Sequence, residues 1–169
     1  AFTSGSTGRP KGVMHSDNTQ LVTARGISKD WKIGAGSVVY SMSPLSHNLG
    51  MGALLTSIYG GASFVVHDCR PSEGTIARVL QVNATYLVGV PTHAIDLLDE
   101  MDALGMNRLG SVTGFRVSGA AASPTVFKRL LHAGVEPQSG YGMTETNGHQ
   151  YTRPGDGPTL IISSCGRAV

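Results

Sequence analysis

The segment with the clearest chemical character lies near the start of the chain, in residues 2–12. It reads FTSGSTGRPKG, so that glycines alternate with hydroxyl side chains. Glycines let the backbone approach a ligand closely, and hydroxyls donate hydrogen bonds. Lys11 adds a mobile positive charge. A polyanion such as a triphosphate needs free backbone N–H groups, hydroxyl donors and a cation together, so we predict a polyanion site here.

A flexible glycine- and serine-rich linker with a chance lysine would have a similar composition. The order of the residues argues against that interpretation. It also argues against the common phosphate loop, which reads G-x-x-x-x-G-K-[ST]. Lys11 follows a proline, and Gly12 stands where that loop needs a serine or threonine for the metal. The segment is therefore not of the kinase or GTPase type.

Residues 140–145, which read GYGMTE, form a second motif. Its two glycines permit a tight backbone path close to a ligand. Tyr141 offers a flat face on which a base can stack, Thr144 offers a hydroxyl, and Glu145 offers an oxygen ligand for Mg²⁺. Taken alone, such a hexapeptide is more often a structural turn than a site. It indicates a site only together with the loop at residues 3–12.

Residues 3–12 closely resemble the signature loop of the adenylate-forming enzymes. This superfamily includes acyl-CoA synthetases, the adenylation domains of peptide synthetases and beetle luciferases. In it the loop is mobile and holds the β- and γ-phosphates of ATP, and the resemblance implies a catalytic role for the lysine. The nucleotide contacts it implies are Thr3, Ser4, Gly5, Ser6, Thr7, Gly8 and Lys11.

Residues 140–145 are similar to the Tyr-Gly-x-Thr-Glu motif of the same superfamily. There the tyrosine lies against adenine, the threonine contacts the α-phosphate and the glutamate helps to hold magnesium. The resemblance thus implies catalytic roles for Thr144 and Glu145, and a magnesium ion at Glu145 and Thr7. The nucleotide contacts it implies are Gly140, Tyr141, Gly142, Met143 and Thr144.

Two further segments resemble the superfamily with one departure each. Residues 118–121 are similar to its Ser-Gly-Gly-Ala segment, which implies that Gly119, Ala120 and Ala121 line the adenine pocket, although Ala120 replaces a glycine. Residues 44–50 resemble Pro-Leu-Phe-His-x-x-Gly, with Ser46 in place of the aromatic residue. The resemblance places His47 near the acyl pocket and the thiol, as a catalytic residue. Without the resemblance, a helix-start histidine bonded to local backbone is the preferred interpretation.

The resemblance implies ATP- and Mg²⁺-dependent activation of a carboxylic acid, fatty or aromatic, to an acyl-adenylate. Thioester formation with coenzyme A would follow. An adenylation domain that loads a carrier protein is the alternative within this chemistry. A non-catalytic nucleotide-binding relic is a third possibility, against which intact Lys11, Thr144 and Glu145 argue. A flavodoxin-like signalling domain is a fourth, but the chain lacks the acidic cluster expected after its first strand.

Composition limits the remaining possibilities. The chain has 169 residues, of which 40% are hydrophobic, and this suffices for a globular core. A net charge of +2 is too small to predict a nucleic-acid surface. Two cysteines make no disulfide framework, and no transmembrane or signal segment is evident. A cytoplasmic location is therefore expected.

The chain begins inside its first motif, and only 14% of its residues are charged, so we expect part of its surface to be covered by other protein. We therefore interpret residues 1–169 as a single partial domain, the nucleotide-binding core of an AMP-binding domain. Its partners would be the N- and C-terminal parts of the same enzyme. Because the resemblance places a further catalytic lysine in a C-terminal domain, we expect residues 1–169 alone to be inactive or nearly so.

Strand and helix patterns alternate along the chain, which predicts an α/β fold with a mostly parallel sheet and helices on both faces. Polar and glycine-rich groups follow the strands, so one cleft is expected at the carboxyl rim of the sheet. We expect an irregular chain after residue 141 and a short strand at 12–14. The other expected strands are 38–40, 63–66, 85–88, 115–117, 136–139 and 159–163. Expected helices cover about 17–30 and 49–59 and follow residues 71, 91 and 123.

Overall fold

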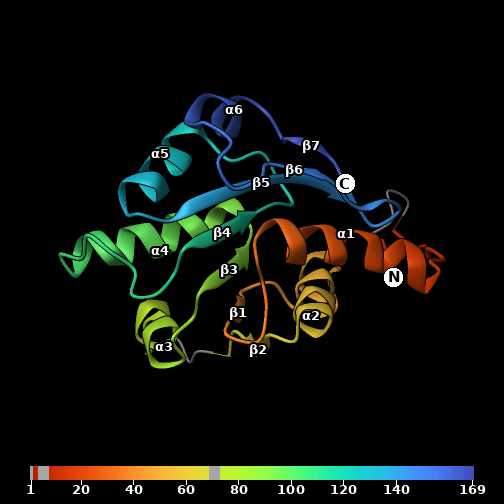
Figure 1. Ribbon diagram of the computed structural model, residues 1–169, viewed down its shortest axis with the longest axis horizontal. Coiled ribbons are helices and arrows are strands. Elements are labelled where there is room, and N and C mark those ends of the chain that lie inside the picture. Colours follow the sequence, from red (N-terminus) through yellow and green to blue (C-terminus); the bar gives the residue numbers. More distant parts are fainter. Residues whose placement is uncertain (1, 4–7, 69–72) are drawn as a thin grey trace.

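The computed structural model describes residues 2–3, 8–68 and 73–169. Within them the chain forms a seven-stranded sheet in the order β2-β1-β3-β4-β5-β6-β7 (Figure 1). The strands β2 (Ser63–Val66), β1 (Val38–Ser41), β3 (Tyr86–Gly89), β4 (Gly114–Val117) and the first half of β5 (Glu136–Met143) pair in parallel. Two antiparallel strands, β6 (Asn147–Tyr151) and β7 (Arg167–Ala168), complete the sheet. The predicted mostly parallel α/β fold is confirmed.

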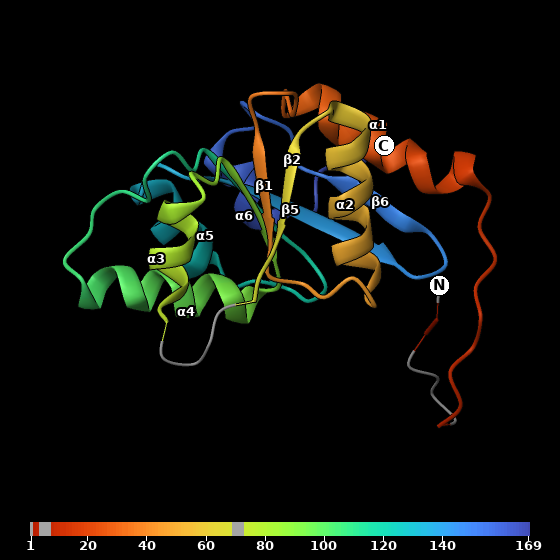
Figure 2. The same cartoon turned by 90° about the horizontal axis from the view of Figure 1, so that it is seen from below.

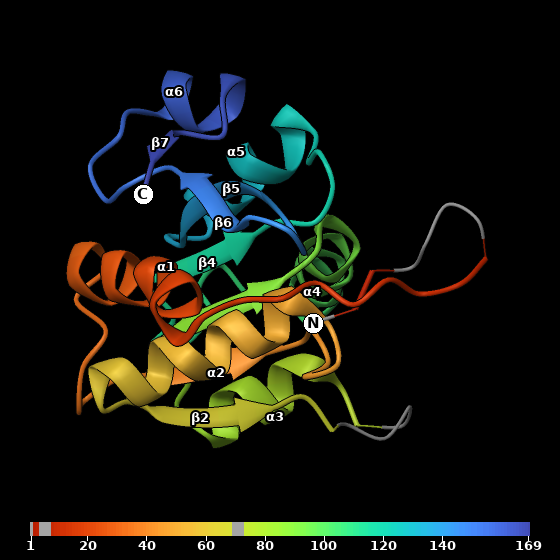
Figure 3. The same ribbon diagram turned by 90° about the vertical axis from the view of Figure 1, so that its right-hand side faces the viewer.

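Helices cover both faces of the sheet (Figures 2 and 3). On one face lie α1 (Asp17–Asp30) and α2 (Asn48–Gly60), which contact each other extensively. On the other lie α3 (Thr75–Gln81), α4 (Pro91–Ala103) and α5 (Pro124–His132), with α6 (Pro158–Ser163) beside α5. Burial on both sides explains why the central strands read as nearly continuous apolar runs.

Successive residues of the central strands serve opposite faces of the sheet, as the period of two requires. Along β3, Leu87 belongs to the core under α3, α4 and α5, whereas Tyr86 and Val88 belong to the core under α1 and α2. Along β4, Phe115 and its next-but-one neighbour Val117 serve the α4–α5 side. The residue between them, Arg116, therefore faces the α1–α2 side.

Two segments differ from the sequence-based expectation. The predicted strand at 159–163 is wrong: these residues belong to α6, which begins at Pro158 and buries only Ile161. Hydroxyls of Ser163 and Ser164 donate to the carbonyls one turn earlier, which supports the helix. The chain after residue 141 is not irregular. It continues β5 and returns as the antiparallel strand β6. Because β6 is mostly polar, a search for apolar strand patterns does not predict this hairpin.

The start of the chain shows an isolated antiparallel bridge between Phe2 and Gly12, where a strand at 12–14 was expected. The helix expected from Pro71 begins later, at Thr75, and Pro71 itself lies outside the described residues. The largely apolar helix α2 is not wholly buried, because Ile58 and Tyr59 are exposed.

Gly50, in the first turn of α2, packs against the loop that precedes this helix. A Cβ at this position would overlap the carbonyl oxygen of Pro44 and lie 2.5 Å from that of Ser43. We expect Gly50→Ala to destabilise the fold by about 1–3 kcal/mol, because the loop has to shift. Gly52→Ala in the same helix is the matched control: no described atom lies within 4 Å of its Cβ, so it should stabilise the helix by up to about 1 kcal/mol. Denaturant unfolding measures both, and equal effects would contradict the proposed contact.

His93, in the first turn of α4, makes stability depend on pH. Its Nδ1 accepts a hydrogen bond from the backbone N–H of Val90 at 3.2 Å. Burial, with a smaller contribution from His67, lowers the pKa of His93 below 6.5. The unfolded chain therefore takes up the proton first, so stability is full above about pH 6.5 and decreases as the pH falls.

We expect His93→Gln to flatten this part of the stability profile between pH 7 and about pH 5. Unfolding free energies of both proteins across that range provide the measurement. Parallel profiles would show that His93 does not contribute.

Candidate functional site

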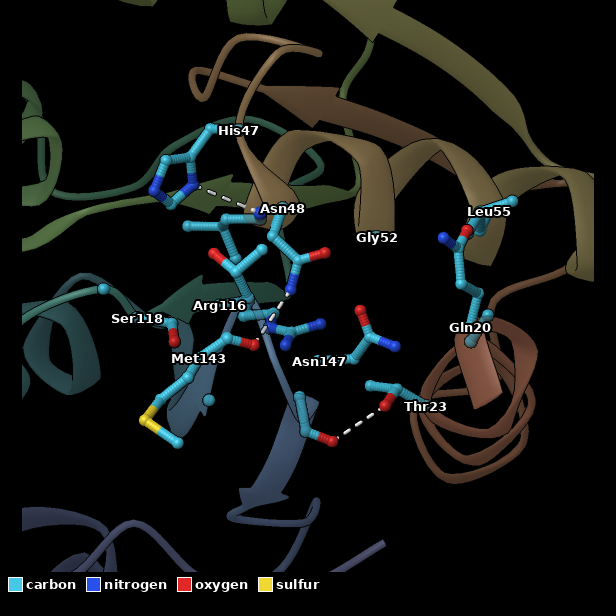
Figure 4. Close-up of a pocket in the computed structure, with 16 residues that line it drawn as sticks. Gln20, Thr23, His47, Asn48, Gly52, Leu55, Arg116, Ser118, Met143 and Asn147 are labelled. Carbon is cyan, nitrogen blue, oxygen red and sulfur yellow. Dashed lines mark hydrogen bonds between the residues drawn. The ribbon is translucent and has the colours of Figure 1, made fainter. Parts of the chain in front are cut away.

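A cavity of about 180 Å³ lies between α1, α2, the end of β4 and the β5–β6 hairpin (Figure 4). The carboxyl end of β4 borders it, as expected for an open α/β sheet. Residues from four parts of the chain line it. They include Gln20 and Thr23 from α1, His47, Asn48 and Leu55 from α2 and its start, Arg116, Ser118 and Gly119 from β4 and its loop, and Met143, Thr144 and Asn147 from the hairpin.

Hydrogen bonds fix the β5–β6 hairpin against α1. The Thr23 hydroxyl donates to the carbonyl of Gly148 at 2.7 Å, and the side-chain amide of Asn147 donates to the carbonyl of Thr19 at 3.1 Å. Asn147 is buried and has a φ of 56°, which asparagine tolerates better than most residues. On the other side, the Asn48 amide donates to the carbonyl of Met143 at 3.4 Å, so both helices position the hairpin.

Gly142 has a structural reason to be glycine within the 140–145 motif. A Cβ at this position would overlap the backbone carbonyl of Asn147 across the hairpin. The strand register also shifts between Tyr141 and Gly142. Turn geometry therefore requires this glycine whether or not a ligand approaches it.

The two segments that the sequence assigns to adenine lie side by side. The Ser118 hydroxyl donates to the carbonyl of Gly140 at 2.9 Å and so ties residues 118–121 to the start of the second motif. Gly119 has a φ of +94°, which explains its identity. Ala120 and Ala121 are exposed beside it.

Tyr141 follows Gly140, to which the loop at residues 118–121 is hydrogen-bonded, and its ring is accessible. Its side chain is 47% exposed, and its ring meets that of His149 edge-to-face, with centroids 6.4 Å apart. A planar ligand can therefore reach this ring from solvent.

A hydrogen bond connects the chain just after the first motif to the second motif. Nε2 of His15 donates to the carbonyl of Thr144 at 2.6 Å. The base of the first loop is closed by a backbone bond from Thr3 N–H to the carbonyl of Lys11 at 3.0 Å. Lys11 is exposed, and so is Glu145, which borders a shallow hollow with His15. The chain just after Lys11 thus lies against the segment that carries Thr144 and Glu145.

The structure brings some predicted site residues together and leaves others apart. His47, Gly119, Gly142, Met143 and Thr144 line the cavity. The predicted residues Lys11, Glu145, Ala120, Ala121, Gly140 and Tyr141 lie outside its lining. Ser4, Gly5, Ser6 and Thr7 lie outside the described residues, and so does the predicted metal contact of Thr7.

His47 occupies the N-cap of α2, where its Nδ1 accepts from the backbone N–H of Leu49 at 3.3 Å. The interpretation preferred without the family resemblance, a histidine bonded to local backbone, therefore describes this nitrogen. The side chain is nevertheless exposed and borders the cavity. A structural role at the helix start and a role at the cavity are compatible.

Sequence reasoning missed Arg116, which reaches from β4 into the middle of the cavity (Figure 4). Its side chain is only 6% exposed, and its Nε is buried without a hydrogen-bond partner. In the described part of the chain it makes no hydrogen bond or ion pair. Burial lowers the pKa of its guanidinium below the ordinary value. The sequence did contain one sign of this residue's role, because Arg116 is a charged residue within an otherwise apolar strand.

A protein-family model described as AMP-binding enzyme matches residues 1–169, the whole chain. The chain belongs to the AMP-binding enzyme family. This AMP-binding enzyme is 30% identical over 171 residues to a (methyl-dioxo-octahydro-indenyl)propanoyl:CoA ligase of Mycobacterium tuberculosis, a match that covers 98% of this chain and 33% of that protein. It is 34% identical over 162 residues to anthranilate–CoA ligase of Pseudomonas aeruginosa, which covers 91% of this chain and 30% of the relative.

Among solved structures, the AMP-binding enzyme superposes on O-succinylbenzoate coenzyme A synthetase of Bacillus subtilis in complex with AMP, with a TM-score of 0.84 and 25% identity. The superposition covers 99% of this chain and 34% of that one. The chain therefore spans about a third of the length of these relatives. None of its described helices is long and apolar enough to cross a membrane.

The unpaired charge of Arg116 has a consequence for stability. A buried charge without a partner destabilises a fold, and an apolar side chain of similar volume removes that penalty. We expect Arg116→Met to stabilise the ligand-free protein by about 1–3 kcal/mol. Arg129→Met is the matched control, because Arg129 is ion-paired to Asp99 and Asp102 at the surface, and its loss should change stability by less than about 1 kcal/mol. Thermal and denaturant unfolding test this, and a destabilised Arg116→Met would contradict it.

Proposed function

We propose that the AMP-binding enzyme that carries this chain is an acid–CoA ligase. It activates a carboxylic acid with ATP and then forms a thioester with coenzyme A. A carboxylate oxygen of the acid attacks the α-phosphorus, the bond to the β-phosphate oxygen breaks, and pyrophosphate leaves. Both reacting groups are negatively charged, so catalysis consists mainly of positioning and charge neutralisation.

The observation that carries this proposal is the convergence of three distant segments at one edge of the sheet. The Ser118–Gly140 bond joins the two predicted adenine segments, and the His15–Thr144 bond joins the chain that follows the phosphate loop to the second motif. One extended ligand with a planar end and an anionic end fits this arrangement. The relative from Bacillus subtilis was solved with AMP, which supports a nucleotide as that ligand.

The donors around Thr144 suit the phosphate end. Lys11 is exposed, and in this proposal its ammonium would bind the β- and γ-phosphates while the Thr144 hydroxyl would contact the α-phosphate. Glu145 is exposed and has no ion pair within the described residues, so its carboxylate is available to a hard cation. Among those residues no group of three His, Cys, Asp or Glu could hold a metal, which suits Mg²⁺ bound mainly through substrate phosphates. When bound at Glu145 and Thr7, Mg²⁺ would neutralise phosphate charge.

The acid would occupy the cavity behind Thr144. A cavity of about 180 Å³ is comparable to one that encloses benzene. This size supports a single aromatic ring or a short chain as the acyl part. A long fatty chain would need space beyond the described walls.

The proposal has two forms, which differ in the thiol that accepts the acyl group. The relatives reported above are named as CoA ligases, which favours coenzyme A. A carrier protein loaded by an adenylation domain remains the alternative, and His47 borders the cavity in either case. Offering both acceptors to the complete enzyme after adenylation, and measuring which thioester forms, distinguishes them.

We further propose that residues 1–169 act as the nucleotide-binding core of a larger domain in a cytoplasmic enzyme. Other parts of the same polypeptide would complete the active site. The low proportion of charged residues, 14%, and the coverage of about a third of each relative support this interpretation.

Removal of Lys11 or Glu145 tests the nucleotide site. In the complete enzyme, we expect Lys11→Ala and Glu145→Gln each to lower ATP–pyrophosphate exchange by about 10²-fold or more, because each removes charge at the phosphates. Exchange with a panel of carboxylic acids provides the measurement, with Mg²⁺-dependent ATP binding as the second readout.

Matched controls lie away from the cavity. Lys128→Ala on α5 and Glu73→Gln before α3 change exposed residues of the same types and should leave exchange unchanged. Full exchange by the Lys11 and Glu145 variants, or no exchange by the wild type with any acid, would contradict the proposed function.

A further inference from the structure

Among the described residues, no carboxylate pairs with the buried positive charge of Arg116. Its side chain is 6% exposed and lies in the wall of the cavity between α1 and α2. The ionisable groups that influence it are the phenols of Tyr86 and Tyr151, and no carboxylate is among them. Burial raises the pKa of both phenols further above physiological pH, that of Tyr151 to about 12, so neither supplies a negative charge there.

A second hydrogen-bond donor without an acceptor lies next to Arg116. Gln138 is the register partner of Arg116 on β5, and its side chain is fully buried. The Tyr86 hydroxyl donates to its Oε1 at 2.5 Å, whereas its Nε2 has no partner among the residues that the structure describes. Two adjacent strands thus place unsatisfied donors on the same face of the sheet. Buried donors are nearly always satisfied in native proteins, so this region lacks an acceptor that a ligand can supply.

Two partly buried acidic side chains of the described chain, Asp30 and Asp156, already have other partners. Asp30 accepts hydrogen bonds from Tyr151 and Arg153, and Asp156 binds Arg153 N–H and Arg167. By contrast Arg129, an arginine at the surface, is paired to two carboxylates. Arg116 is the only charged residue among the buried residues of the described chain, and its side chain borders a cavity.

The depth of Arg116 tells which end of a substrate it would meet. It lies two residues before Ser118 on β4, and two residues of a strand span about 6–7 Å. Thr144, where the reacting carboxylate meets the α-phosphate in the proposed function, lines the same cavity and is less buried than Arg116. A substrate that reacts at Thr144 would direct its opposite end toward Arg116.

We propose that the acid carries a second anionic group, a carboxylate in the simplest case, which Arg116 binds at the inner wall of the cavity. This inference rests on the proposed function and specifies its substrate class. A guanidinium binds a carboxylate through two parallel N–H···O bonds, and an excluded-water cavity strengthens that pair. The cavity volume limits the acid to a compact one, such as a benzene dicarboxylate or a diacid of about six carbons.

The test compares acids that share a carbon skeleton and differ in the second carboxylate. ATP–pyrophosphate exchange is measured with the complete enzyme for hexanoate against adipate, and for benzoate against isophthalate and terephthalate. We expect the wild type to prefer at least one diacid over its monoacid by tenfold or more in kcat/KM, because a buried charge left unpaired disfavours the monoacid.

Three variants assign this preference to the side chain. Arg116→Met should abolish the preference and keep exchange with monoacids, while Arg116→Lys should keep a reduced preference. Arg129 lies in α5, on the other face of the sheet, so Arg129→Met should show the same preference for diacids as the wild type. Thermal stabilisation by the free diacids, without ATP, gives a second readout that Arg116→Met should remove.

The outcomes separate this inference from the function on which it rests. If the wild type uses monoacids and diacids equally and Arg116→Met does not change exchange, the inference is overturned, while the proposed ligase function still holds. Equal loss of both acid classes in a folded Arg116→Met protein overturns it too, because Arg116 would then serve the reacting carboxylate. If no acid supports exchange, the proposed ligase function is contradicted. The inference then has its own test: it is overturned if free diacids do not stabilise the wild type, or if they stabilise Arg116→Met equally.

Discussion

The hydrogen bonds between α1 and the β5–β6 hairpin are the interaction on which the whole site depends. Thr23 and Asn147 fasten the hairpin to α1, and Asn48 at the start of α2 holds its other side. The hairpin in turn carries Thr144, which receives the bond from His15. Segments far apart in sequence therefore meet because a short antiparallel extension of a parallel sheet is held in place by two helices. Were the hairpin free, the carboxyl edge of the sheet would present separate loops and no common cavity.

Much of this arrangement was predictable from the sequence, for identifiable physical reasons. Apolar strands alternate with capped helices, so the α/β class and the order of most elements followed from patterns such as Ser123-Pro124 at the start of α5. The β5–β6 hairpin was not predictable in the same way. Its second strand is polar, and its pairing depends on Asn147 adopting a positive φ and on Gly142 fitting against a carbonyl. Residues 159–163 contain leucine and isoleucines that suit a strand or a helix, and only packing of Ile161 decides between them.

The site was predictable where chemistry is local and was missed where it depends on tertiary structure. Short motifs such as residues 140–145 are recognisable by composition, because phosphate and base recognition needs particular residue types close together. Arg116 has no such local context: its importance comes from the cavity that α1, α2 and the hairpin enclose around it. An unpaired buried charge weakens the ligand-free fold, and such local sacrifices of stability concentrate at functional sites. The conflict between an arginine and its apolar strand was itself the clue.

The position of β2 at one edge of the described sheet has a practical consequence. Its residues Phe64, Val65 and Val66 form a short apolar strand, paired to β1 on one side, and Val66 is 39% exposed. The outer side of such a strand presents backbone donors and acceptors that can template the addition of another chain. Material produced as this chain by itself is therefore prone to self-association through β2 at high concentration. Charged substitutions at exposed Ser63, rather than changes near the cavity, are the appropriate means of keeping it dispersed.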